Sequence, residues 1–279
     1  MIAHDTIRRP AVAGMFYPGT KEELESEVGR LLDAASAQPS AKKEGVLTGL
    51  IVPHAGYMYS GATAARAYHL AKGADIETCI LIGPSHQEYF MGVSVYPGAA
   101  YVTPLGEAPI DQDLRDKLLS HSPLIQEAAE GHRAEHSLEV QLPFLQTVLP
   151  EAKIVPLVMG DQESETCWEL GTIVADASRG KKVLLVASSD LSHFYPSTVA
   201  RTKDQEVLSL IGAFDIRGLL TQLESGSCEA CGGGPIAAVM SAAQELGATR
   251  ATIVHACNSG DITGDTSRVV GYCSAALWR

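Results

Sequence analysis

Three histidines each stand just beyond an apolar run of strand length. His54 ends the segment VLTGLIVPH, His86 follows ETCILIGPS, and His193 together with Asp190 follows KKVLLVAS. Ligands of open α/β sheets bind beyond the carboxyl ends of the strands, so parallel strands would bring these side chains to one edge. Such a group can hold a divalent metal ion or carry out acid–base catalysis, since an imidazole donates a lone pair and titrates near neutral pH. Any one of them alone is more simply an ordinary loop histidine.

A pair of thiols, Cys228 and Cys231, precedes the glycine cluster 232–234 and Pro235. One CxxC pair is weak support for structural zinc, and the helical segment before it is not typical of a thioredoxin motif. Pro235 suits the first turn of a following helix, and a thiolate is favoured near a helix N-terminus. Cys231 is therefore a candidate metal ligand or nucleophile, while two incidental thiols in a glycine loop remain the simpler alternative.

The segment GHRAEHSLE, residues 131–139, concentrates polar groups before an apolar helix. His132 and His136 are four residues apart and would share a helix face, unless the helix begins only near Ser137. Glu135 and His136 could orient metal ligands or form an acid–base pair over a bound ligand. Ordinary capping of a polar helix start explains the same residues without any function.

The elements that must position these groups are apolar runs rich in Val, Ile and Leu that alternate with helical stretches. We expect strands in the segments 46–57, 77–87, 91–98, 152–160, 181–194, 251–260 and 267–278. We expect helices near 20–35, 60–73, 109–121, 137–150, 163–180, 199–225 and 235–246. This alternation predicts an α/β fold, a single three-layer α/β/α sandwich around a mostly parallel sheet. The hairpin-like neighbours CILIG and GVSVY, and the closing pair of strands, indicate a mixed sheet.

The composition limits which classes of function the protein can have. The 279 residues carry 19% charged and 46% hydrophobic side chains and a net charge of −12, which is typical of a globular chain and fits one domain over 1–279. The acidic balance argues against nucleic acid and anionic membranes as partners. With neither a membrane span nor an apolar leader visible, we expect a cytoplasmic protein with reduced thiols. No serine-hydrolase elbow, phosphate-binding loop or dinucleotide fingerprint is present in the sequence.

Taken in order, RRPAVAGMFYP, VPHAGYMYSG, GPSHQ, EHSLEVQLPFL, SSDLSHF and CGGGPI closely resemble the motifs of the Memo family. Its bacterial and archaeal members are often called AmmeMemoRadiSam system protein B. The resemblance implies a fold like that of class III extradiol ring-cleaving dioxygenases and a metal site of two histidines and one cysteine. By motif position these ligands are His54, His86 and Cys231. Gly234 departs from the pattern, because animal members carry a histidine there.

The resemblance implies iron(II) as the metal, with copper as an option because a thiolate is a soft ligand, and zinc as a weaker one. We expect a non-haem redox or dioxygenase-like protein acting on a small molecule, with an aromatic compound as one option. His193 and Asp190, with His136, would do the acid–base work. The alternatives are a metal- or peptide-binding protein without turnover that acts with partners, such as a radical SAM enzyme, and a zinc hydrolase using the same cleft.

Overall fold

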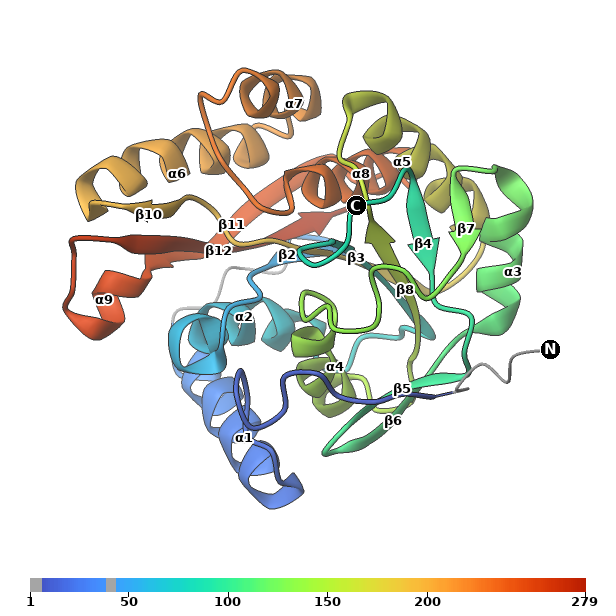
Figure 1. Ribbon diagram of the computed structural model, residues 1–279, viewed down its shortest axis with the longest axis horizontal. Coiled ribbons are helices and arrows are strands. Elements are labelled where there is room, and N and C mark those ends of the chain that lie inside the picture. The colour runs from blue at the N-terminus through green and yellow to red at the C-terminus, as the bar shows by residue number, and fades with distance from the viewer. Residues whose placement is uncertain (1–6, 39–43) are drawn as a thin grey trace.

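The apolar segments form strands and the segments between them form helices (Figure 1). The computed structural model of the protein describes residues 7–38 and 44–279. The strands are β1 (Ile7–Arg8), β2 (Leu47–Val52), β3 (Thr78–Pro84), β4 (Val93–Val95), β5 (Ala100–Thr103), β6 (Gly106–Pro109), β7 (Ile125–Glu127), β8 (Lys153–Met159), β9 (Val183–Ser188), β10 (His193–Tyr195), β11 (Arg250–Asn258) and β12 (Val269–Trp278). The helices are α1 (Lys21–Ser36), α2 (Tyr57–Ala71), α3 (Gln112–His121), α4 (Leu142–Val148), α5 (Ser164–Ser178), α6 (Ser197–Gly212), α7 (Ile216–Glu224), α8 (Gly233–Glu245) and α9 (Ser259–Thr263), with a 3₁₀ turn at Glu139–Gln141.

The main sheet has nine strands, in the order β10-β12-β2-β9-β3-β8-β4-β7, with β11 pairing to β12. Its centre is parallel, because β2, β9, β3 and β8 are joined by parallel ladders. Towards the edges the pairing becomes antiparallel, between β12 and β2 and between β4 and β8. The arrangement puts the ends of β2, β9 and β3 side by side at one edge of the sheet.

Both faces of this sheet are covered, which makes the predicted three-layer sandwich correct (Figure 1). Alternate residues of a strand point to opposite faces. In β3, Ile80 and Ile82 join the core beneath α3, α5, α6, α7 and α8. Cys79 and Leu81 of the same strand join the core beneath α1, α2 and α4. A strand buried on both faces must be apolar throughout, which is why the sequence shows continuous runs rather than alternation.

One predicted pairing is wrong. The segments CILIG and GVSVY are not a hairpin, because β8 lies between β3 and β4 and pairs with both. No tight turn joins the two strands, and strands that follow each other in the sequence need not pair in the sheet. The connection between them, residues 85–92, is a loop that carries His86 at the edge of the sheet. The closing strands β11 and β12 do pair antiparallel, as expected.

The helices are surface layers of the sandwich. Helix α1 begins after Thr20, whose hydroxyl accepts a hydrogen bond from the backbone N–H of Glu23. Its inward side buries Leu24, Val28 and Leu31. None of the helices in the described ranges has both the length and the apolar composition that crossing a bilayer requires.

Candidate functional site

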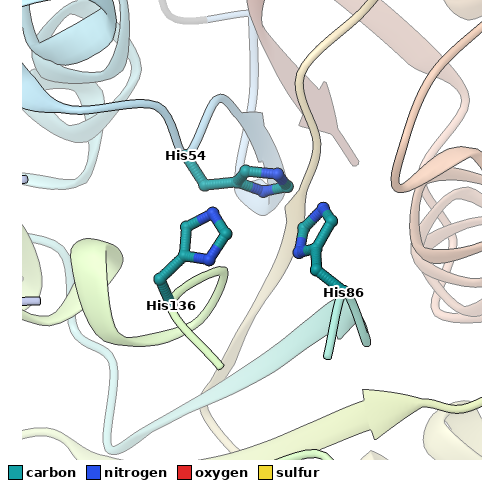
Figure 2. Close-up of side chains that lie close together, drawn as sticks. All are labelled: His54, His86 and His136. Carbon is teal, nitrogen blue, oxygen red and sulfur yellow. The ribbon is translucent and has the colours of Figure 1, made fainter. Parts of the chain in front are cut away.

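Three loops meet where β2, β9 and β3 end. His54 lies two residues beyond β2 and His86 two residues beyond β3, while Asp190 follows β9. A fourth segment, between β7 and the 3₁₀ turn, brings His136 to the same place, as Figure 2 shows. The ligand nitrogens of His54, His86 and His136 all lie within 4.8 Å of one another. Neutral imidazoles at this spacing can share one metal ion.

The tautomer of His54 follows from its neighbours. Ser188 Oγ donates its hydrogen to the carbonyl of Ser137 at 2.6 Å, and it accepts from Nε2 of Gln141 at 2.8 Å. Nδ1 of His54, 2.9 Å from the same oxygen, must therefore donate to it. Burial lowers the pKa of His54 well below its ordinary value. The ring is thus neutral, with the lone pair of Nε2 directed away from Ser188.

His86 is oriented by Glu135 in the same way. Nδ1 of His86 is 2.9 Å from Oε1 of Glu135, and the backbone N–H of His86 donates to Oε2 at 2.5 Å. The carboxylate also accepts from the N–H groups of His136 and Ser137. Burial by itself would raise the pKa of Glu135, but the hydrogen bonds and charge of His86 outweigh it and lower the pKa to about 2. An ionised partner on Nδ1 leaves Nε2 of His86 free to bind a metal.

His136 completes the cluster of rings. It stacks on His86 with 4.8 Å between centroids and meets His54 edge to face at 5.4 Å (Figure 2). Phe16, which precedes α1, also contacts the His136 ring, with 4.8 Å between centroids. Nδ1 of His136 is 3.3 Å from Oε1 of Glu135. The geometry allows His136 either to bind a metal or to exchange protons beside it.

Cys231 lies against the histidine cluster. Its Sγ is 3.1 Å from Nε2 of His54, the nitrogen that Ser188 leaves free, and it accepts from the backbone N–H of Asp190 at 3.2 Å. The expectation that the helix N-terminus favours the thiolate is wrong for the metal-free protein. Although α8 begins at Gly233, desolvation raises the pKa of the Cys231 thiol. A metal ion would replace the thiol proton that now faces His54.

The loop that carries Cys231 is held by Gln162. The side-chain amide of Gln162 donates to the carbonyl of Cys231 at 2.8 Å and accepts from the N–H of Gly234 at 2.7 Å. A Cβ placed on Gly234 would lie 2.8 Å from Cβ of Gln162. The space that a side chain at position 234 would need is therefore filled by Gln162.

Asp190 and His193 take different positions. Asp190 is buried, and its Oδ1 accepts from the backbone N–H of His54 at 2.8 Å, so it joins the loops after β2 and β9. Burial raises its pKa to about 7. His193 is half-buried, and Nδ1 bonds the carbonyl of Leu191 at 2.8 Å, which leaves Nε2 free. Its ring lines a cavity that also has Cys231 in its wall.

The proposed pairing of His132 with His136 on one helix face does not occur. The 3₁₀ turn begins only at Glu139, so the segment before it is not helical. His132 is buried between the hydroxyls of Tyr101 and Ser94 and belongs to the core. Sequence reasoning gave no role to Ser188, although it belongs to the motif SSDLSHF, or to Gln162, because both act through contacts that tertiary folding creates.

Glu135 should make stability depend on pH. Its pKa in the folded protein, about 2, is below the ordinary 4.5, so ionised Glu135 favours the folded state above pH 4.5. That contribution, up to about 3 kcal/mol, is lost as the pH falls from about 4.5 to about 2. In urea unfolding without metal, Glu135→Gln should be less stable than wild type at pH 6, and the gap should narrow steadily as the pH falls below 4.5 towards 2. Glu22→Gln, on exposed α1, serves as the control; a gap that is constant with pH contradicts the prediction.

Similar proteins share this fold and sequence. The crystal structure of an uncharacterized protein, JW3007, from Escherichia coli K12 superposes with a TM-score of 0.58 at 16% identity, covering 83% of this chain and 99% of that one. At that identity the likeness concerns the fold alone.

Relatives in archaea are much closer in sequence. A MEMO1 family protein of Methanosarcina mazei is 42% identical over 272 residues, covering 96% of this chain and 98% of its own length. Another, from Thermoplasma volcanium, is 38% identical over 277 residues, covering 98% and 99%. The sequence pattern of the family described as Memo-like protein matches residues 8–276. With this coverage and identity, the chain belongs to the Memo family.

Proposed function

We propose that the protein binds a redox-active metal ion, iron(II) first and copper(I) as the alternative, through His54, His86 and Cys231. The observation that carries the proposal is that the imidazoles of His54 and His86 each have Nδ1 engaged by a protein acceptor, which leaves Nε2 free. The thiol of Cys231 already lies 3.1 Å from one of these nitrogens. Metal-binding histidines are typically held in this way by a second hydrogen bond.

The donor set by itself is compatible with several metals. Two imidazoles and a thiolate with open positions suit non-haem iron(II) or a catalytic zinc, and the soft sulfur favours copper(I). The preference for iron or copper over zinc rests on the resemblance to the Memo family. When bound, such a metal supplies redox chemistry towards oxygen and a small aromatic substrate. This resembles the dioxygenase-like activity that the family's fold suggests.

The remaining polar groups would handle protons and hold the loops. Burial lowers the pKa of His193, so its ring is neutral at pH 7, and its free Nε2 can accept a proton from a ligand in the adjoining cavity. His136, which stacks on His86, can exchange protons beside the metal. Asp190 contributes by holding the backbone of His54 through its carboxylate.

The test is metal analysis of protein purified without oxygen and reloaded with iron(II) or copper(I). We expect close to one metal ion per chain, and a loss of at least about tenfold in affinity for Cys231→Ala. Cys228→Ala is the matched control, because Cys228 belongs to the same loop but is buried among apolar side chains. Equal metal retention by both variants would remove Cys231 from the ligand set.

Turnover is tested separately. Oxygen uptake by the metal-loaded protein with catechol compounds should depend on His193, with His193→Gln lowering the rate more than it lowers metal content. A loaded protein that consumes no oxygen with any of these compounds would favour a metal-binding role without catalysis.

A further inference from the structure

A cavity of about 560 Å³ opens beside the candidate metal centre. Its walls come from the start of α5, the end of α7 and the loop that precedes α8, and they include both Cys231 and His193. This size is within the range of small-molecule sites. Cys231, whose sulfur faces His54, is one of the lining residues.

The charged side chains that line this cavity are acidic. They are Glu163, Glu224 and Glu229, and across the described residues no lysine or arginine joins them in the lining. Lys203 neutralises Glu229 at 3.1 Å. Glu163 and Glu224 have no ion pair with any described side chain. Glu224 is moreover the last residue of α7, where the helix dipole already places negative potential.

Besides Lys203, the described residues offer a second positive feature at the wall, the start of α8, and it is closed to anions. Helix α8 starts at the cavity, and a free helix N-terminus would bind a phosphate or carboxylate. The backbone N–H groups of residues 231–234, however, all donate within the protein. Their acceptors are Asp190 O, Ser189 Oγ, Ala230 O and Oε1 of Gln162. A bound anion would meet two unneutralised carboxylates without a free backbone donor from this turn.

The wall also has an apolar part, made by Leu191, Leu220, Leu223 and Ala230. We propose that this cavity binds a small organic ammonium compound, with the ammonium group at Glu163 and Glu224 and an apolar body against the leucines. This assignment rests on the proposed function: the compound is then the substrate, or the amine-bearing part of the substrate. Its apolar body extends towards Cys231 and His193.

The experiment compares three probes that share one ring and differ in the charge of the tail. They are 2-phenylethylamine, 2-phenylethanol and 3-phenylpropionate, titrated calorimetrically into the full chain with and without iron(II) under anaerobic conditions. The amine should bind at least about tenfold more tightly than the alcohol, because the alcohol lacks the charge-assisted hydrogen bond, and the carboxylate should bind weakest, because the glutamates repel its charge. Its affinity should fall as salt is added.

The double variant Glu163→Gln/Glu224→Gln should lose about tenfold in affinity for the amine and keep its affinity for the alcohol. Glutamine can still accept the hydrogen bond that Ser164 donates to Glu224, so the fold should persist, and thermal unfolding checks it. Glu165→Gln is the matched control, because Glu165 is exposed in the first turn of α5, two residues after Glu163, and lies outside the cavity lining.

The inference is overturned if the amine binds no more tightly than the alcohol, or if the double variant behaves like Glu165→Gln. Either result leaves the metal proposal intact when iron(II) still binds. Amine preference in a protein that binds no metal supports the cavity assignment and removes only its link to the proposed function.

Discussion

Replacing His86 with alanine is expected to lower the affinity for iron(II) by at least about 100-fold. The buried carboxylate of Glu135 already holds the His86 ring at Nδ1, so orienting the ring costs little free energy when the metal binds. His86 should therefore contribute a large share of the free energy of metal binding. Glu135→Gln should have a smaller effect, about 10- to 100-fold, since it keeps the ring but removes the charge that orients it. Anaerobic competition titration with a chromogenic chelator measures both affinities.

His121→Ala is the control for the His86 measurement, because His121 is exposed at the end of α3. It should bind iron(II) as wild type does. If His86→Ala keeps its affinity while His136→Ala loses it, the ligand set contains His136 in place of His86, and Glu135 then acts on the neighbouring ring. If neither histidine matters, the cluster in Figure 2 is not the metal site.

Glu139→Ala is expected to destabilise the fold by about 3–5 kcal/mol, because it leaves a buried charge without a partner. The Glu139 carboxylate is fully buried and ion-pairs with Arg8, which is itself buried. It also accepts from the backbone N–H groups of Ala11 and Val12 and from the hydroxyl of Tyr17. Urea unfolding of metal-free protein at pH 7 gives the change in unfolding free energy from the shift in midpoint.

Glu27→Ala is the matched control, since Glu27 pairs with Arg30 on the surface of α1 and should contribute less than about 1 kcal/mol. A similar small effect at Glu139 would contradict the assignment of a buried anchor. Glu139→Gln, which can still accept hydrogen bonds, should fall between the two.

The same anchor connects stability to the site. Nε of Arg8 donates to the carbonyl of His132 at 2.7 Å, and a second guanidinium nitrogen donates to the carbonyl of Glu135. The N-terminal arm thereby holds the segment that carries Glu135 and His136. Glu139→Ala should therefore also weaken metal binding, because Arg8 would hold this segment less firmly.

Much of the fold could be predicted because it depends on local composition. Runs of Val, Ile and Leu without alternation require a sheet buried on both faces, and their spacing leaves room only for helices between them. Parallel strands then bring their carboxyl ends to one edge, which is how His54 and His86 could be expected at one place before any coordinates. The pairing of β4 could not be predicted in this way, because β8 enters the sheet between β3 and β4 from later in the chain.

The chemical state of the site depends on contacts that no local pattern records. Ser188 and Gln141 determine the tautomer of His54 from positions far along the chain. His132 and His136 look equivalent in sequence, yet one is enclosed in the core and the other faces the site. The expected lowering of the Cys231 pKa by the nearby helix is reversed by desolvation, which only the surrounding protein can impose.

The amino-acid sequence by itself therefore determined the layers, the central strands and the residue types that reach the sheet edge, since hydrophobic burial and strand direction act through local pattern. Only the tertiary structure decided which nitrogen of each histidine is free, which carboxylate is ionised and what charge lines the adjoining cavity. These properties arise from hydrogen bonds and desolvation between segments distant in the chain, and electrostatic free energies change steeply with such distances and with burial.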